Sequence, residues 1–159
     1  MRKRYYAIIL MILTLGGCAT TTHVYQVEVC LIGHEQEEEF YAFMQTVATT
    51  SHLVFKDGSE RFERDMQEIE HIGDLSALPG ETIYFGAESE SGTGGFTAAN
   101  IGLNPLQIAV GMSPTRDRSF DDRVINRTID EISRRWTAHR VPASETFKPR
   151  SGCGEVARD

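Results

Sequence analysis

The sequence predicts an α+β fold: an antiparallel sheet of about four strands with two to three helices packed on one face. Segments with apolar residues at every second position alternate with segments whose apolar residues recur every three or four positions. Two strand-like segments follow each other in mid-chain without a helix between them, which favours antiparallel pairing. The order strand, helix, strand, helix, strand, strand, helix, tail suggests a ferredoxin-like arrangement with an inserted helix.

The first strand is expected at residues 24–32, where Val27, Val29 and Leu31 alternate with polar residues. A half-buried strand shows this period of two, and it places Cys30 on the face away from the core. Further strands are expected at residues 52–55 and 82–87, followed by a return strand that begins at 96–101, is interrupted near 102–105 and continues at 106–112.

The first helix is expected at residues 35–50, because Phe40, Phe43, Met44 and Val47 form one apolar stripe. A second helix is expected at residues 60–71. A β-hairpin through Asp57-Gly58 is its competitor.

The last helix is expected at residues 122–139, capped by Ser119 or Asp121. Its apolar residues recur at helical spacing: Ile125, Ile129, Ile132 and Trp136. Residues 143–159 are expected to form an extended tail, of which 154–159 are disordered.

The N-terminus has the pattern of a secretory signal peptide. Three basic residues, 2–4, precede an apolar run, and Gly16-Gly17 provides the small residues of a cleavage site before Cys18. The apolar run is too short to cross a bilayer as a helix, which takes about 20 residues.

Leu15-Gly16-Gly17-Cys18 resembles the lipobox of bacterial lipoproteins. The resemblance covers residues 1–18 only, and Gly16 is less typical at its position than Ala or Ser. It implies cleavage before Cys18 and attachment of lipid to the Cys18 thiol. Ala19, rather than Asp, implies outer-membrane sorting and a domain that faces the periplasm if the source is Gram-negative.

The resemblance divides the chain into a signal peptide (1–17), a lipidated N-terminus with a short tether (18–22), one α+β domain (23–153) and the tail (154–159). Loss of the three basic residues at 2–4 leaves 13 basic and 23 acidic residues, a net charge of −10. Such a charge repels nucleic acid and anionic lipid, so attachment to the membrane is expected through the lipid on Cys18.

The charge is unevenly distributed. Residues 34–74 hold eleven acids and three bases, whereas residues 116–140 hold seven arginines and five acids. Two solvated helix faces would explain this pattern, and an acidic surface for a basic partner would explain it too. The candidate partner contacts are Glu35, Glu38, Glu88 and Glu90.

With Cys18 assigned to lipid, Cys30 and Cys153 are left as a pair in an oxidising compartment, which predicts a disulfide between them. Two free thiols, or a Cys30 buried as a small apolar residue, are the alternatives.

The sequence offers no recognised catalytic, metal or cofactor motif, so no catalytic residue, metal or cofactor is expected. His34-Glu35 begins like a zinc-binding helix, but Glu38 stands where the second histidine belongs. The glycine-rich residues 86–95 lack the lysine of a phosphate-binding loop. We interpret them as a mobile hairpin loop and a reasonable partner contact.

These observations lead to a membrane-anchored envelope lipoprotein with a non-catalytic protein-binding or structural role. An immunity-type inhibitor of a periplasmic toxin is the alternative, in which the Glu-rich helix masks a basic active site. A small hydrolase is the third hypothesis, and it would combine Ser89, Ser91, Glu88 and Glu90 with a histidine.

Overall fold

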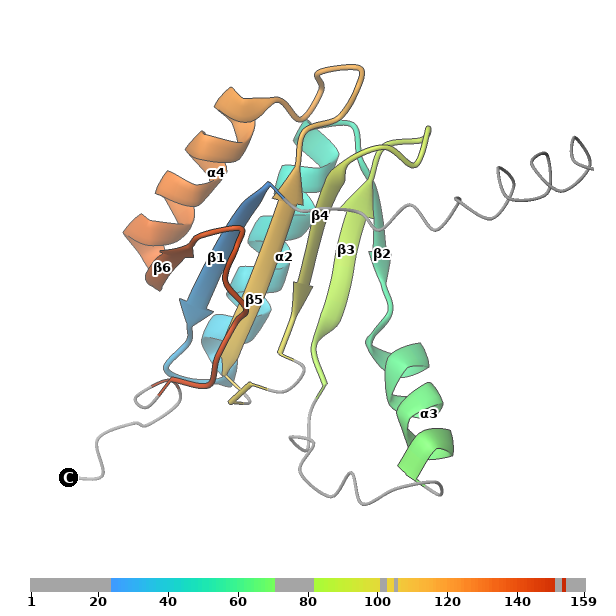
Figure 1. Cartoon of the computed structure of the whole chain (residues 1–159), viewed down its shortest axis with the longest axis vertical. Coiled ribbons are helices and arrows are strands. Elements are labelled where there is room, and N and C mark those ends of the chain that lie inside the picture. Colours follow the sequence, from blue (N-terminus) through green and yellow to red (C-terminus); the bar gives the residue numbers. More distant parts are fainter. Residues whose placement is uncertain (1–23, 71–81, 101–102, 105, 151–152, 154–159) are drawn as a thin grey trace, which may run out of the picture.

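A computed structural model describes residues 24–70, 82–100, 103–104, 106–150 and 153 (Figure 1). The predicted signal peptide, the tether and the tail at 154–159 lie outside these residues. In the described residues no helix is long and apolar enough to cross a membrane.

The described residues form an antiparallel six-stranded sheet and three helices, which confirms the α+β class. The elements in chain order are β1 (Tyr25–Cys30), α2 (His34–Thr50), β2 (Val54–Asp57), α3 (Ser59–Glu70), β3 (Tyr84–Glu88), β4 (Gly95–Ala99), β5 (Gln107–Ser113), α4 (Asp122–Arg135) and β6 (Thr137–Val141). In the sheet the strands are ordered β2-β3-β4-β5-β1-β6. The expectation of about four strands was too low.

The strand β6 replaces the predicted end of the last helix. The helix was expected to continue to residue 139, but α4 ends at Arg135, and Trp136 has extended backbone angles of −131° and 160°. The next residues pair with β1, with Ala138 opposite Val29. Trp136 continues the apolar spacing of α4, and this spacing is why the sequence predicts a helical residue there. It is buried, with its ring edge-on to Phe40 at 5.1 Å.

One face of the sheet, which we call the inner face, packs against α2 and α4 (Figure 1). Val27 and Val29 of β1 point to this face, as predicted, and so do Ile108 and Val110 of β5. The helices contribute Phe40, Met44 and Val47 from α2, and Ile125, Ile129 and Ile132 from α4.

The helix α3 is an exception to the expected packing of helices on one face. Residues 59–70 are helical, so the competing hairpin through Asp57-Gly58 was wrong. The Phe62 ring of α3 packs against Tyr84, with 5.4 Å between the centroids. Tyr84 alternates with the buried Phe85, so it points away from the inner face. We call the opposite side the outer face.

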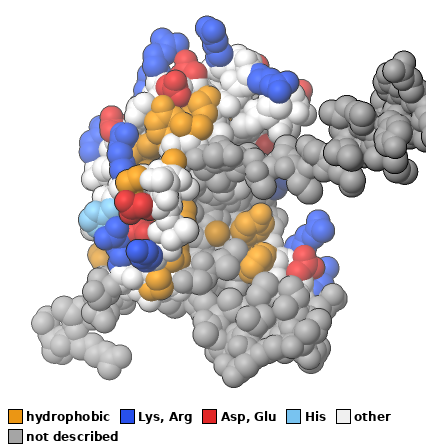
Figure 2. Space-filling model, in the orientation of Figure 1, with side chains coloured by type: hydrophobic (Ala, Val, Ile, Leu, Met, Phe, Trp, Pro, Cys, Tyr) orange, Lys and Arg blue, Asp and Glu red, His pale blue; other side chains and the backbone are white. Residues whose placement is uncertain are grey.

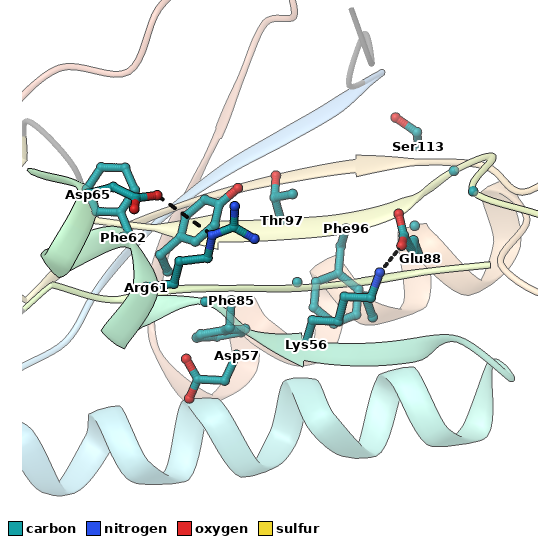
Figure 3. Close-up of a pocket in the computed structure, with 17 residues that line it drawn as sticks. Lys56, Asp57, Arg61, Phe62, Asp65, Phe85, Glu88, Phe96, Thr97 and Ser113 are labelled. Atoms are coloured by element: carbon teal, nitrogen blue, oxygen red, sulfur yellow. Dashed lines mark hydrogen bonds and ion pairs between the residues drawn. The ribbon is translucent and has the colours of Figure 1, made fainter. Parts of the chain in front are cut away.

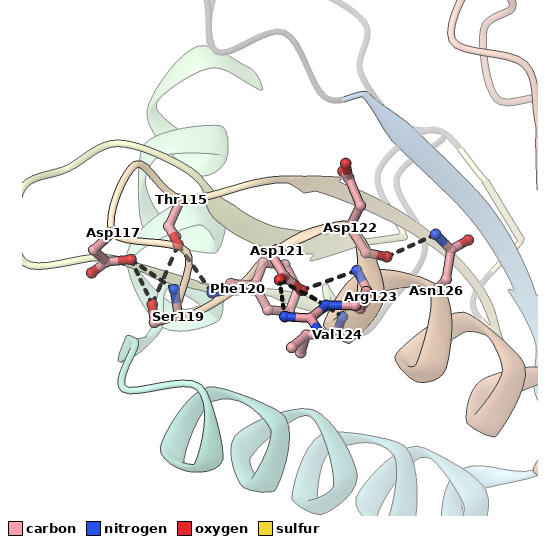
Figure 4. A network of polar contacts seen from close by, with 9 residues as sticks. All are labelled: Thr115, Asp117, Ser119, Phe120, Asp121, Asp122, Arg123, Val124 and Asn126. Carbon is pink, nitrogen blue, oxygen red and sulfur yellow. Dashed lines mark hydrogen bonds and ion pairs between the residues drawn. The ribbon is translucent and has the colours of Figure 1, made fainter.

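The loop between β5 and α4 is held by its own polar side chains (Figure 4). The backbone N–H of Thr115 donates to the carbonyl of Phe120 at 3.0 Å, and the Phe120 N–H donates to the Thr115 hydroxyl at 3.0 Å. Asp121, one of the two predicted caps, accepts from the N–H groups of Arg123 at 3.0 Å and Val124 at 3.1 Å. These bonds fix the entry into α4.

Hydrogen bonds in this loop lower the pKa of the Asp117 carboxyl to about 2; the side-chain bond from Thr115 has the largest effect, followed by the bonds from Ser119. Because the folded-state pKa lies below the ordinary value of 3.8, the charged carboxylate stabilises the fold above pH 4. This contribution is lost as the pH falls from about 4 towards 2.

We therefore predict that Asp117→Asn lowers the urea midpoint at pH 7, and that its difference from the parent disappears by about pH 2. Urea titrations at stepwise pH values measure this difference. The control is Asp130→Asn, which removes one charge from an exposed position on α4 and should change the midpoint less. A parent-to-variant difference that stayed constant down to pH 2 would contradict the prediction.

Candidate functional site

The outer face of the sheet is divided into two parts. The C-terminal residues 143–150, with Cys153, cross β5 and β1, and we call them the C-terminal strap (Figure 1). Over β2, β3 and β4 lies an open groove of about 630 Å³, which α3 borders (Figure 3).

The C-terminal strap is bound to two polar residues of the sheet, Glu28 of β1 and Gln107 of β5. The Gln107 amide donates to the carbonyl of Lys148 at 2.7 Å and accepts from the Arg150 N–H at 2.8 Å. One Glu28 oxygen accepts from the Lys148 N–H at 3.3 Å, and the other pairs with the Arg150 guanidinium. Asn104 adds a bond to the carbonyl of Arg150.

Glu28 and Gln107 are both buried, at 2% and 0% exposure. A buried carboxylate requires a paired charge and hydrogen bonds, because burial without them costs several kcal/mol. The C-terminal strap supplies these partners. Its position on the sheet is therefore determined by polar contacts with particular residues.

The disulfide between Cys30 and Cys153 attaches the C-terminal strap covalently to β1. The Cα atoms are 4.8 Å apart, and 123 residues separate the two cysteines in sequence. Cys30 alternates with Val29, which faces the core, so it lies on the outer face where the sequence pattern predicted it. The bridge and the Glu28–Arg150 pair hold the same segment.

The groove has a floor of small residues. Gly86, Gly95 and Thr97 of β3 and β4 line it. A Cβ at Gly86 would lie 2.6 Å from the carbonyl oxygen of Phe96, which is too close for an unperturbed strand. Gly95 has a φ of 137°, which favours glycine, and a Cβ there would meet the backbone of Ala87. The floor is therefore low because the backbone geometry requires glycine.

The walls of the groove combine aromatic and charged side chains. The tilted rings of Phe62 and Tyr84 pack against each other at one end, and Tyr84 is 38% exposed. Lys56 pairs with Glu88 across β2 and β3, and Arg61 lies 3.7 Å from Asp65 on α3 (Figure 3). Each cation has an acidic neighbour, so the groove is mixed in polarity and carries no strong single charge.

The four acids proposed as partner contacts do not form one surface. Glu35 and Glu38 are exposed in the first turns of α2, which follows the end of β1 where Cys30 pairs with Gln107. Glu88 and Glu90 are exposed at the β3–β4 hairpin, beside the other end of β5, where Gly95 pairs with Ser113. The two pairs thus lie at opposite ends of the sheet.

The hairpin loop, residues 89–94, is organised around Ser89, which is 3% exposed. Its hydroxyl donates to the Thr93 carbonyl at 2.9 Å and accepts from the Thr93 N–H at 3.1 Å. The Ser91 hydroxyl lies 2.8 Å from that of Thr93 and 3.1 Å from that of Ser89. Across the described residues, these hydroxyls have hydrogen-bond partners within the loop and none that is a histidine. This arrangement gives the hydrolase hypothesis no support.

Two sets of residues at this face were missed from the sequence. Glu28 and Gln107 occupy outward positions of strands, and the alternation of apolar residues gives no indication that the C-terminal strap buries them. The predicted disulfide was the available signal, because a tail bonded to Cys30 has to cover the residues next to Cys30. The groove residues Phe62 and Tyr84 had no such signal, since their contact depends on which face α3 approaches.

No group of three or more possible metal-ligating side chains occurs within the described ranges.

Removal of the disulfide should destabilise the domain strongly. In the chain-entropy model a bridge that closes a loop of this length contributes about 5 kcal/mol to the free energy of unfolding. The polar contacts of the C-terminal strap remain when the bridge is absent, so the expected loss extends below this value. We predict that Cys30→Ser/Cys153→Ser lowers the free energy of unfolding by about 3–5 kcal/mol. Urea unfolding of parent and variant measures the loss, and dithiothreitol should reproduce it in the parent only. A loss below about 1 kcal/mol would show that the bridge adds little to the strap's polar contacts.

Comparison of the chain with models of known protein families, with curated proteins and with solved structures finds no match.

Proposed function

We propose that the chain is a membrane-anchored envelope lipoprotein whose domain has a non-catalytic, protein-binding role. The anchor rests on the sequence pattern at residues 15–18. The binding role is inferred from the groove over β2, β3 and β4. The proposed occupant is an extended segment of another envelope protein.

The groove suits such a segment for three reasons. Its floor of glycine and threonine allows a partner backbone to approach the sheet closely. The partly exposed Tyr84 ring offers an apolar contact of the kind enriched at protein interfaces. The Lys56–Glu88 pair offers a donor and an acceptor at the other end of the groove.

The alternative, an immunity-type inhibitor, is favoured by a different observation. Glu35 and Glu38 are exposed on α2 and, unlike Glu88, have no cation paired with them within the described part of the chain. Acids in this position could contact a basic active site of a toxin. Protection against a secreted toxin that Glu35→Gln/Glu38→Gln removes, with the groove unchanged, would favour this alternative.

We also infer that the domain is a widened ferredoxin-like arrangement. Two observations support this inference: β1-α2-β2 and β5-α4-β6 each connect two parallel strands that are not neighbours, and the two units interleave as β5-β1-β6. The hairpin strands β3 and β4 lie between β2 and β5 and account for the additional width.

For the anchor, we predict that Cys18→Ser prevents lipid attachment and moves the protein from the membrane fraction to the soluble fraction. Intact-mass measurement should show acyl chains on the parent protein and none on the variant. Cys30→Ser/Cys153→Ser is the matched control, because it removes cysteines but leaves residues 15–18 intact, and it should stay in the membrane fraction. An unchanged distribution of the Cys18→Ser variant would contradict the proposed anchor.

For the groove, we predict that a photo-crosslinking residue at Tyr84 gives a discrete adduct with an envelope protein in cells. The same residue at Gln45, which is exposed on α2 on the opposite side of the sheet, should not give it. A second change, Thr97→Trp, fills the floor of the groove and should reduce the yield of the adduct about tenfold. A tenfold reduction corresponds to a loss of roughly 1.4 kcal/mol in the free energy of binding. An adduct that persists in the Thr97→Trp background would contradict binding in the groove.

A further inference from the structure

The two ends of the sheet differ in their distance from the proposed lipid anchor. The chain enters the described domain at Val24, whose N–H donates to the carbonyl of Met112 at 3.0 Å. Met112 lies near the end of β5, directly before the β5–α4 loop. The Tyr25 hydroxyl also donates to Asp122 at the start of α4, at 2.9 Å. The β5–α4 loop therefore lies beside the point where the tether joins the domain.

The tether is short. Five residues separate Cys18 from Val24. An extended chain spans at most about 3.6 Å per residue, so Cys18 stays within roughly 20 Å of Val24. If Cys18 carries the lipid, the end of the domain with the β5–α4 loop is kept close to the membrane surface.

This end carries arginines that stand away from the body of the domain (Figure 2). Arg116 and Arg118 are exposed, and neither pairs with an acid in the described part of the chain. Arg123 is exposed too, but it pairs with Asp121 at 3.1 Å. The positive charge available to a ligand therefore comes from Arg116 and Arg118.

The acids of the loop remain negatively charged, and each is held in place by local hydrogen bonds. Asp117 accepts from the Ser119 N–H and hydroxyl, Asp121 caps α4, and Asp122 accepts from Tyr25. Glu90, on the neighbouring β3–β4 hairpin, is exposed at the same end of the sheet. Its negative charge weakens the positive potential that the two arginines produce there.

The backbone of the turn adds an independent observation. Arg118 has a φ of 62°, in the left-handed region that favours glycine or asparagine. The Arg118 N–H closes the turn on the carbonyl of Thr115 at 3.2 Å. A glycine would satisfy this backbone at lower cost, so the arginine side chain is present at some expense to the fold.

We propose that Arg116 and Arg118 form a second membrane contact, in which their guanidinium groups bind the anionic headgroups of the bilayer that holds the anchor. This contact rests on the proposed lipid anchor and goes beyond it, because it fixes the orientation of the domain. A cation close to an anionic membrane surface strengthens binding by roughly fivefold per residue. The acids elsewhere in the domain oppose this contact only weakly, because charges more than about 8–10 Å apart are largely screened at physiological salt. The acids in or beside the loop reduce it, so the guanidinium groups of Arg116 and Arg118 have to reach the headgroups beyond these carboxylates.

The test uses the full lipidated chain in vesicles of phosphatidylcholine alone and of phosphatidylcholine mixed equally with phosphatidylglycerol. Hydrogen–deuterium exchange is measured over residues 114–121, with the start of α2 as the distant reference. We expect exchange at 114–121 to be slowed at least fivefold in the anionic vesicles only, as roughly one arginine contact requires. The start of α2 should be unaffected.

Two variants and a matched control sharpen the result. Arg116→Gln/Arg118→Gln should abolish the slowing, and Arg118→Gly should weaken it while melting at or above the parent temperature, because glycine relieves the left-handed turn. Arg64→Gln/Arg134→Gln removes the same charge from positions near the other end of the sheet and should preserve the slowing.

The outcomes separate the contact from the anchor. The contact is overturned if exchange is equal in both vesicle types, or if the slowing survives Arg116→Gln/Arg118→Gln. In either case, the proposed anchor still holds if the protein floats with the vesicles. Protein that carries no acyl mass and does not float overturns the anchor and the contact with it.

Discussion

The contact between the C-terminal strap and β1 determines what the outer face can do. Without its cover, Glu28 would lose its ion pair with Arg150, and Cys30 would be left as a thiol. The strap pairs the first with Arg150 and bonds the second to Cys153. It thereby closes the face over β1 and β5 and leaves the part over β2, β3 and β4 open, where the groove lies.

The inner face shows why this division is possible. The helices α2 and α4 supply most of the apolar cover of the sheet on that side, together with Phe120 of the β5–α4 loop and Trp136, which follows α4 and packs on Phe40. The outer face is not needed for the main core, so small residues such as Gly86 and Thr97 can occupy it. Small residues on a sheet face contribute little burial of their own, and they leave room for the backbone of another segment.

The sequence predicted the parts of the fold that follow from local periodicity, and it failed where tertiary contacts decide. The alternation in β1 placed Cys30 correctly because a period of two assigns faces without further information. Trp136 continues the apolar spacing of α4, but the residues after it pair with the edge of β1 and form a strand. Helix propensity alone could not reveal that this edge was available for pairing. The positions of the four candidate contact acids relative to one another also depend on tertiary structure: only the strand order places Glu38 and Glu88 at opposite ends of the sheet.

Net charge is a poor guide to how a tethered domain meets a membrane. A free domain with the charge of −10 expected after cleavage would be repelled by an anionic bilayer, but in the proposed lipoprotein a short tether would remove most of the choice of orientation and present one end. That end carries the exposed Arg116 and Arg118, while the Glu-rich start of α2 is at the far end. In this proposed orientation the strands would rise from the membrane and the groove would open sideways along it. A partner that binds the groove would then be another protein of the same membrane surface, or a segment that reaches along it.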